Sequence, residues 1–344
     1  MARNYTEGMT GDQDGVARLL EMTRGYVVTK TLFVAAQLGI ADRLADGPRP
    51  VAELAAVAGA HPRALHRILR ALASYGVFAE TEPGVFALGA LGQLLRTDAP
   101  GSLRHWVLTN GGLLYRALGH ADHSAATGEP AFRRAYGADL FEYLAAHPEH
   151  SATFDAAMAD FSRRSAAAVL QAYDLSAARW LVDVGGGNGA FAIAALRAHA
   201  GMRAIVFDQP HVVAAVLPHA RQAGVADRCS VVAGDFFAEV PGGHGTYVLS
   251  WIVHDWDDER ALRILSNCRS AIPDHGRLLL VEAVVPEGDT PHFSKFGDIV
   301  MLVALGGQER TADEYRRLLE RAGFRLERIV ATAGPRSVLE ALPA

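Results

Sequence analysis

The chain has 344 residues, which is long enough for two domains that each bury a hydrophobic core. Its residues are 50% hydrophobic and 21% charged, as is typical of globular proteins, and its formal net charge of −5 argues against nucleic-acid binding. Cys229 and Cys268 are far apart and no His motif accompanies them, so neither a disulfide framework nor a zinc site is expected.

The N-terminal segment MARNYTEGMTGDQDG is polar and lacks the apolar core of a signal peptide. No run of the sequence approaches the roughly 20 apolar residues that span a bilayer. We therefore expect a soluble, cytoplasmic protein that does not bind membranes, with disorder in residues 1–12.

The N-terminal part of the chain, residues 13–100, is expected to form a winged-helix-like domain. Apolar residues recur at helical spacing from Val16 to Leu44. The segments VAELAAVAGA and HPRALHRILRALASYG then predict a helix, a turn and a second helix. A short hairpin with EPG at its turn completes the motif.

A winged helix is compatible with two functions. DNA binding calls for a basic recognition helix, and the second helix carries basic side chains: His61, Arg63, His66, Arg67 and Arg70. That helix is also rich in Ala and Leu, and the N-terminal half is otherwise not basic. We therefore favour packing or dimerisation over DNA binding.

Residues 101–175 are expected to form a helical linker, and residues 176–344 an α/β domain. The short apolar runs WLVDVG, RAIVFDQ, CSVVAGDFF, GTYVLSW and RLLLVEAVV alternate with helical stretches. Nearly continuous hydrophobicity is typical of parallel strands that are buried on both faces. The pattern predicts a parallel sheet covered by helices, as in a Rossmann-like domain.

The segment LVDVGGGNGA, residues 181–190, ends a predicted strand in a cluster of glycines. Glycines leave backbone amides unshielded, so we expect a phosphate, a ribose or an amino-acid group to come close. Gly185, Gly187 and Ala190 satisfy G-x-G-x-x-A, and Asp208 ends the next strand. At this point NAD and S-adenosylmethionine are both compatible with the pattern.

The third predicted strand favours S-adenosylmethionine. It is followed by Asp235 and Phe236, at the edge where ligands bind in open α/β sheets. The carboxylate could accept a hydrogen bond from an adenine amino group while the phenyl ring lies against the base. Neither a pyrophosphate nor a catalytic set for nicotinamide chemistry is indicated.

A histidine and two carboxylates follow later strands. His254 lies just beyond the fourth strand, Glu282 closes the fifth, and Glu309 precedes the helix ADEYRRLLERAG. A buried carboxylate beside an imidazole fixes its tautomer and stabilises the imidazolium once a proton arrives. If the three residues meet, they form a general-base cluster.

The successive motifs LVDVGGGNGA, FDQPHV, GDFF, SWIVHDWDDE, LLLVEAVVP and GGQERT resemble those of the S-adenosylmethionine-dependent O-methyltransferases. This family includes plant caffeic acid and flavonoid enzymes and bacterial antibiotic-tailoring enzymes. The resemblance covers nearly the whole chain, because the N-terminal half is similar to the family's dimerisation domain. It implies a Rossmann-like class I methyltransferase fold with a winged-helix dimerisation domain, a homodimer, and S-adenosylmethionine as cofactor.

The resemblance also implies roles for single residues. His254 would be the general base, flanked by Glu282 and Glu309. The cofactor would be bound by Ser162, Gly185, Gly187, Asp208, Asp235, Phe236, Ser250 and Trp251. The acceptor would be bound by Phe154, Met158, Asp255 and Met301. Core packing is the alternative for Phe154, Met158 and Met301.

Three departures from the plant pattern point to bacterial members of the family. Ser250 stands where plant members carry a lysine, Gln209 replaces the leucine of FDLPHV, and MLVALGG is one position shorter than its plant counterpart. We therefore expect an aromatic natural product, such as a polyketide, as the acceptor. Alternatives are N-methylation, another chemistry on the same fold (hydroxylation, decarboxylation or cyclisation), and transcriptional regulation through the winged helix.

Overall fold

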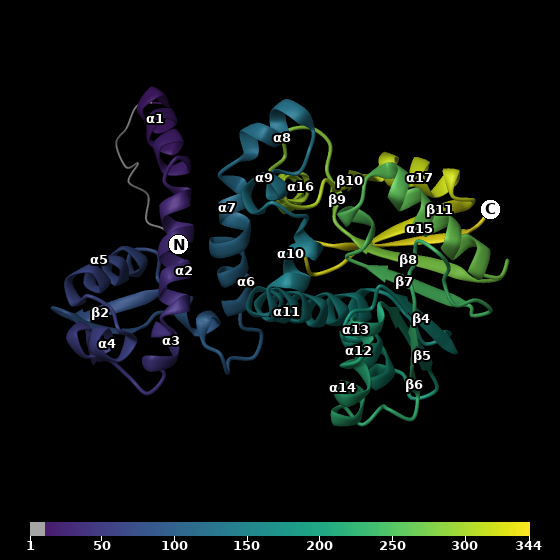
Figure 1. Cartoon of the computed structure of the whole chain (residues 1–344), viewed down its shortest axis with the longest axis horizontal. Helices are drawn as coiled ribbons and strands as arrows, with labels where there is room; N and C mark the ends of the chain where they lie inside the picture. The colour runs from purple at the N-terminus through teal and green to yellow at the C-terminus, as the bar shows by residue number, and fades with distance from the viewer. Residues whose placement is uncertain (1–10) are drawn as a thin grey trace. The chain divides into compact units, whose positions relative to one another are not determined.

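The computed structural model describes residues 11–344, with side chains from Gly15 onward. Two predictions about the N-terminal segment, disorder and the lack of a signal peptide, therefore concern residues that lie largely outside this range. Helix α1 begins at Gly11. The chain divides into two compact units (Figure 1). The first combines the chain up to Arg116 with His147–Asp160, and the second combines Ala117–Ala146 with Phe161–Ala344.

The first unit is mainly helical, with a small sheet of strand order β1-β3-β2. The antiparallel strands are β1 (Arg49–Pro50), β2 (Phe78–Glu82) and β3 (Val85–Leu88). The helical elements are α1 (Gly11–Met22), α2 (Gly25–Gln37), α3 (Ile40–Arg43), α4 (Val51–Ala58), α5 (Pro62–Ala73), the 3-10 helix η1 (Gly92–Leu95), α6 (Arg104–Thr109) and the π-helix η2 (Asn110–Leu114). Helices α7 (Tyr115–Leu118) and α11 (Pro148–Ala172) contribute residues to both units.

Helices α4 and α5 and the hairpin β2–β3 form the expected winged helix. Gly59 ends α4 with a left-handed φ of +65°, and Pro62 begins α5. Helix α5 buries Leu65, Leu69 and Leu72 on one face, while its arginines are exposed on the other. Pro83 and Gly84 of the predicted EPG form the hairpin turn, and Glu82 ends β2.

The second unit is built on a seven-stranded sheet of order β11-β12-β8-β7-β4-β5-β6. Its strands are β4 (Trp180–Val184), β5 (Arg203–Asp208), β6 (Cys229–Ala233), β7 (Thr246–Ser250), β8 (Arg277–Glu282), β11 (Phe324–Ala331) and β12 (Ser337–Pro343). A separate parallel pair joins β9 (Val284–Val285) and β10 (Arg310–Thr311). All five apolar runs of the sequence are strands, and they run parallel to one another.

Two further strands, which the sequence does not predict, extend the parallel sheet and run antiparallel. Strand β12 pairs antiparallel with β8, and β11 pairs antiparallel with β12. Residues 332–336 are the whole connection between β11 and β12. So short a connection permits only a hairpin, because a parallel crossover needs about a dozen residues or more. The result is a mixed sheet.

Helices cover both faces of this sheet (Figure 1). Leu181 and Val206 belong to a hydrophobic cluster with α11, α12, α13 and α14, whereas their neighbours Val182 and Phe207 belong to a second cluster with α15 and α17. Successive strand residues face opposite sides, so burial on both faces explains the continuous apolar runs. The helical elements of this unit are α8 (Ala121–Thr127), α9 (Ala131–Tyr136), α10 (Leu140–Ala146), α12 (Ala190–Ala198), α13 (Pro210–Val213), α14 (Val216–Gln222), η3 (Val253–Asp255), α15 (Asp258–Ala271), α16 (Phe293–Ala304) and α17 (Ala312–Arg321).

Cys229 and Cys268 are buried free thiols. Among the described residues, no helix combines the length and the apolar character that crossing a membrane requires.

Candidate active site

The glycine loop begins where β4 ends. Gly185 and Gly187 have left-handed φ values of +69° and +58°, a region that favours glycine. A Cβ atom on Gly185 would lie 2.5 Å from the side chain of Ile252, whereas a Cβ atom on Gly187 would meet nothing within 4 Å. Packing therefore requires the first glycine, and the second exposes bare backbone beside open space.

Strand β4 marks the point where the strand order reverses, because β5 lies on one side of it and β7 on the other. Ligands of open α/β sheets bind at the carboxyl edge at such a point. The glycine loop follows β4, Asp208 ends β5, and Ser250 ends β7. The structure therefore places these predicted cofactor residues at one edge of the sheet.

Asp208 is attached to the glycine loop. Its Oδ2 accepts a hydrogen bond from the N–H of Gly187 at 2.9 Å, and its Oδ1 accepts one from the N–H of Gln209 at 2.7 Å. Burial raises the pKa of Asp208, while these two donors act in the opposite direction. The loop and the end of β5 are thus joined through one carboxylate.

Asp235 and Phe236 follow β6. The Asp235 side chain is exposed, and its Oδ1 accepts a hydrogen bond from the N–H of Phe237 at 2.8 Å. The half-buried ring of Phe236 lies edge-on to Phe237 and to Trp256, with ring centroids 5.0 and 6.2 Å apart. An exposed carboxylate beside an aromatic ring is compatible with the adenine-binding role expected from the sequence.

Two polar atoms at the end of β7 are buried and have no hydrogen-bond partner among the described residues, Ser250 Oγ and Trp251 Nε1. Trp251 also has a left-handed φ of +64°, which is uncommon for a bulky residue and typical of functional sites. Buried polar groups are normally hydrogen-bonded. These atoms and the open space beside Gly187 fit a ligand with many polar atoms, as S-adenosylmethionine is.

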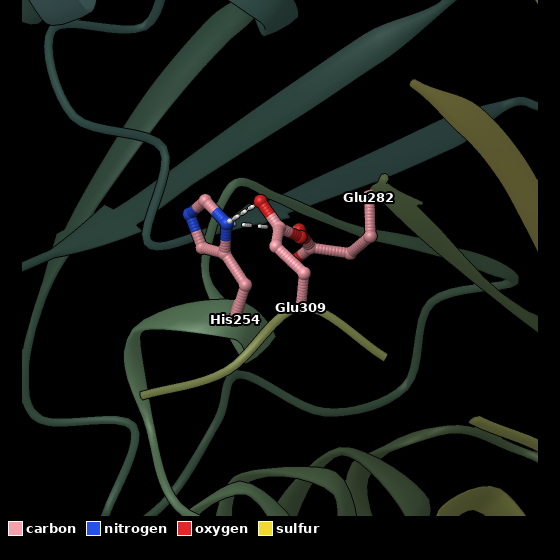
Figure 2. A group of neighbouring side chains, drawn as sticks. All are labelled: His254, Glu282 and Glu309. Carbon is pink, nitrogen blue, oxygen red and sulfur yellow. Dashed lines mark hydrogen bonds and ion pairs between the residues drawn. The ribbon is translucent and has the colours of Figure 1, made fainter. Parts of the chain in front are cut away.

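His254 lies on the turn η3 and is 3% exposed. Its Nδ1 is 3.0 Å from Oε1 of Glu309 and 3.8 Å from Oε2 of Glu282 (Figure 2). Glu282 ends β8, and Glu309 directly precedes β10. The structure therefore brings together the three residues that the sequence suggests for a general-base cluster.

The backbone of the His254 turn is fixed from two sides. Oε1 of Glu282 accepts hydrogen bonds from two successive N–H groups of this segment, at 3.0 and 2.8 Å. On the other side, the N–H of Gln308 donates to the carbonyl oxygen of His254 at 2.9 Å. A Cβ atom on Gly307 would lie 2.1 Å from the same oxygen, so only glycine fits there.

Arg336 belongs to this cluster, and sequence reasoning missed it. It directly precedes β12 and is 4% exposed. Its Nη1 donates to Oε2 of Glu282 at 3.2 Å, and its Nη2 is 3.7 Å from Oε1 of Glu309. Its guanidinium lies 3.3 Å from the centroid of the Trp251 ring. An arginine in GPRS looks like an exposed loop residue, and no sequence pattern marks it as buried.

Burial and charge shift the pKa values of the cluster in different directions. Burial alone would lower the pKa of His254, but the carboxylates of Glu282 and Asp255 outweigh it and raise that pKa above its usual value. Arg336 opposes them. Burial raises the pKa of Asp255 to about 6. Burial also favours a higher pKa for Glu309, but His254 and Arg336 outweigh it, so the pKa of Glu309 is lowered.

His254, Glu282 and Glu309 offer ligand atoms within 4.8 Å of one another, a grouping that could hold a metal ion. The guanidinium of Arg336 already pairs with both carboxylates. A side chain of the protein therefore supplies a positive charge to this donor set, and the arrangement fits an acid–base cluster better than a metal centre.

The remaining predicted residues lie on two helices. Ser162 lies in the part of α11 that belongs to the second unit, and Met301 lies on α16 of the same unit. Phe154 and Met158 lie on the part of α11 that belongs to the first unit, one turn apart on the same helix face. All four side chains are half-buried. Their participation in one site stays a prediction.

A Rossmann-like sheet with a glycine loop at its point of reversal, followed by a buried histidine with carboxylates, defines a class I methyltransferase. Residues 115–325 match the O-methyltransferase domain, and residues 20–98 match the O-methyltransferase dimerisation domain. The chain therefore belongs to the S-adenosylmethionine-dependent O-methyltransferases, and S-adenosylmethionine is its methyl donor.

Three similar proteins illustrate the range of this family. A phenazine O-methyltransferase of Lysobacter antibioticus is 49% identical over 325 residues, which cover 94% of this chain and 95% of the relative. A phenazine-1-carboxylate N-methyltransferase of Pseudomonas aeruginosa is 31% identical, over 91% of this chain and 92% of its own. The solved structure of an O-methyltransferase from neocarzinostatin biosynthesis, in complex with S-adenosylmethionine and 2-hydroxy-5-methyl naphthoic acid, has a TM-score of 0.81 at 34% identity, and the match covers 92% of this chain and 96% of that chain.

Proposed function

We propose that this enzyme methylates a phenolic hydroxyl group of a fused-ring aromatic natural product, with His254 as the general base. The observation that carries the proposal is the arrangement around the imidazole. Nδ1 of His254 faces Glu309 at 3.0 Å in a buried site, which leaves Nε2 to take a proton. The ring structures named for two relatives, a phenazine and a naphthoic acid, support the acceptor class.

Bound S-adenosylmethionine supplies a methyl group on a sulfonium sulfur, which leaves as a neutral thioether. A phenol has a pKa of about 10 and is a weak nucleophile near neutral pH, so a base that removes its proton accelerates the reaction by roughly 10²–10⁴-fold. The bond from the acceptor oxygen to the methyl carbon forms while the hydroxyl proton passes to Nε2 of His254. Glu309 holds the imidazole in the tautomer that leaves Nε2 unprotonated and then stabilises the imidazolium.

Asp255 supports an acceptor position next to His254. Its Oδ1 is 3.3 Å from Nε2 of His254, the nitrogen that would receive the proton. An acceptor hydroxyl that reaches Nε2 therefore also meets the Asp255 carboxyl group, which can bind a second polar substituent of the ring. We assign acceptor binding to Asp255 and, on the two helices, to Phe154, Met158 and Met301.

The cofactor is assigned to the carboxyl edge of the sheet. The open space beside Gly187 and the unpartnered atoms Ser250 Oγ and Trp251 Nε1 support this position. We assign the methionine part to the glycine loop, the ribose to Asp208, and the adenine to Asp235 and Phe236. The remaining cofactor residues are Gly185 and Ser162.

A homodimer through the first unit is part of the proposal. Exposed apolar side chains lie on α1 and α2, and a monomer would leave them in contact with water. They are Val16, Leu19, Leu20, Met22 and Tyr26. The two free thiols fit a reducing cytoplasm, and we expect no nucleic-acid partner. Sedimentation as a monomer, or a salt-dependent shift of duplex DNA, would contradict this assignment.

The activity is tested with methyl-labelled S-adenosylmethionine and a panel of hydroxylated phenazines and naphthoates, followed by mass spectrometry. We expect one labelled methyl group on a ring hydroxyl of at least one acceptor. Methoxy analogues of the same rings are matched controls, because their oxygen cannot be methylated. Label on the methoxy controls, or on no hydroxyl of the panel, would contradict the proposal.

N-methylation is the second candidate, because one relative is named as an N-methyltransferase of a phenazine. A ring nitrogen with a free lone pair carries no proton that a base must remove. The variant His254→Ala therefore separates the two reactions: O-methylation requires the imidazole, whereas N-methylation of an unprotonated ring nitrogen proceeds at the wild-type rate.

A further inference from the structure

Arg336 is a buried cation at the centre of the base cluster. Its guanidinium contacts four side chains that come from three segments of the chain, and its own exposure is 4%. It donates to Glu282 at 3.2 Å, lies 3.7 Å from Glu309, and lies over the ring of Trp251 at 3.3 Å from its centroid. A charge taken out of water is expensive unless it is paired, so these contacts hold the arginine in place.

The same arginine faces the imidazole. Nη1 of Arg336 is 3.5 Å from Nδ1 of His254, and both groups turn toward the Glu309 carboxylate. Arg336 carries only donors, and Nδ1 must itself donate to Glu309 if Nε2 is to act as the base. The arginine and a protonated His254 therefore compete for the same carboxylate charge.

We propose that Arg336 is a positioning residue that counteracts protonation of His254, so that more of the imidazole is neutral when the acceptor proton arrives. The inference rests on the proposed function of His254 as the base. Two buried carboxylates beside a histidine would by themselves draw a proton onto it, and an imidazolium cannot remove a proton from the acceptor. The guanidinium balances part of that negative charge in advance.

The other charged groups around His254 cannot take over this task. Asp255 on the same turn and Asp298 on α16 are both acidic, so neither can supply the positive charge that balances the carboxylates. Arg310 is engaged with Asp258 and with backbone carbonyl groups. Tyr315 on α17 is buried, and its burial keeps the phenol neutral by raising its pKa. Among the described side chains, Arg336 is thus the cation that contacts the base cluster directly.

The contact with Trp251 gives the arginine a second role, which is to hold the indole ring in place. A planar guanidinium can stack on an aromatic ring, whereas a lysine ammonium cannot do so in the same way. The Trp251 ring also lies edge-on to His254 at 5.8 Å between centroids, so it contacts both the arginine and the imidazole. The variant Arg336→Lys keeps the charge and loses the stacking, so it separates the two roles.

The proposal is tested by NMR titration of ¹³C-labelled histidine in the dimeric protein without cofactor or acceptor. The chain has 14 histidines, and the His254 signal is identified by its absence in His254→Gln. In Arg336→Gln we expect the titration midpoint of His254 to move to higher pH by about one unit, a roughly tenfold change in its protonation equilibrium. In Arg336→Lys we expect it to stay near the wild-type value.

The control is Arg277→Gln. Arg277 lies at the opposite end of β8 and pairs with Glu340 of β12 at 3.5 Å, so it joins the same strands without facing His254. We expect no shift of the His254 midpoint in this variant. If Arg336→Gln does not fold, Glu282→Gln is compared with the double variant Glu282→Gln/Arg336→Gln, in which the loss of the arginine should again raise the midpoint.

An unchanged or lowered His254 midpoint in the folded arginine variant would overturn the inference. Because the titration needs no turnover, it is independent of the methylation assay. A raised midpoint together with an absence of O-methylation would contradict the proposed function and leave the effect of Arg336 on His254 intact. In an active enzyme, the acidic limb of kcat/KM should move to higher pH by the same factor.

Discussion

The carboxyl edge of the large sheet has two parts that satisfy their polar groups differently. The first part lies at β4, β5 and β6. Here the loop after β4 is shaped by glycines with left-handed φ, and the carboxylates of Asp208 and Asp235 accept hydrogen bonds from nearby backbone N–H groups. At β7, β8 and β12, the charges of Glu282 and Arg336 are buried and satisfy one another. The first part depends on backbone conformation and the second on charge balance, so different substitutions should disrupt them.

The largest expected effect is on the charge-balanced part. His254→Ala should lower kcat for a phenolic acceptor by roughly 10²–10⁴-fold, because the hydroxyl proton loses its base, while the cofactor Kd stays close to wild type. Raising the pH should restore part of the rate, since an ionised phenol needs no base. The control His244→Ala changes a histidine that lies against Trp180 at the start of β4, and it should keep the wild-type rate. A wild-type kcat for His254→Ala at neutral pH would show that positioning alone drives the reaction.

A smaller loss is expected for Glu309→Gln. The amide oxygen can still accept the hydrogen bond from Nδ1 of His254, but the charge that stabilises the imidazolium is removed. Hydrogen bonds to charged groups contribute about 1.5–3 kcal/mol and neutral ones about 0.5–1.5 kcal/mol, so the lost charge should cost about 1–1.5 kcal/mol. The value of kcat should therefore fall roughly tenfold, which is less than in His254→Ala. Steady-state kinetics of both variants on one acceptor provide the measurement. A loss in Glu309→Gln that equals the loss of the base itself would contradict a supporting role.

The backbone-shaped part is tested by a matched pair, Gly185→Ala and Gly187→Ala. Both place a side chain at left-handed φ, at a cost of about 1–2 kcal/mol. Only Gly185→Ala also brings a Cβ atom to 2.5 Å from Ile252. Chemical denaturation without cofactor should therefore show the larger loss of unfolding free energy for Gly185→Ala. Equal losses would mean that the turn conformation alone, and not the contact with Ile252, requires the first glycine.

The smallest expected effect is a displaced pH profile. In the proposed mechanism the neutral form of His254 is the active one, and its pKa is raised above the usual 6.5 because the carboxylates outweigh burial. The rate should therefore increase as the pH rises through that higher pKa, so the acidic limb of kcat/KM has its midpoint above 6.5. The profile is measured on an acceptor whose own pKa is well above the range. A midpoint at or below 6.5 would mean that the carboxylates do not control the base.

The backbone-shaped part could be predicted well from the sequence. Gly185, Asp208 and Asp235 each stand where an apolar strand ends, and the carboxyl ends of parallel strands share one edge. His254, Glu282 and Glu309 could be suggested for the same reason, because each follows or ends a strand-like run or opens a helix. The order of motifs then indicated the family, which the matches over residues 20–98 and 115–325 confirm.

The charge-balanced part could be predicted only in outline. Arg336 lies in a hairpin loop, and only the antiparallel return of β12 beside β8 brings it against Glu282. Neither FRLERIVA nor SVLEALP is predicted as a strand from the sequence, so the pairing of the two strands with each other and with β8 could not be predicted. The hydrogen bonds that the N–H groups of Ile252 and Val253 donate to Glu282 could not be predicted either, because they depend on tertiary contact and not on sequence spacing.

The close contact at Gly307 has a practical consequence for exchanging parts between related enzymes. Its backbone lies directly against the carbonyl oxygen of His254, and the neighbouring Gln308 donates to the same oxygen. The segment that connects α16 to Glu309 therefore packs directly against the turn that carries His254. A chimaera that imports α16 to alter acceptor choice must import or preserve this glycine, because any side chain there would displace the imidazole before it altered which molecule is methylated.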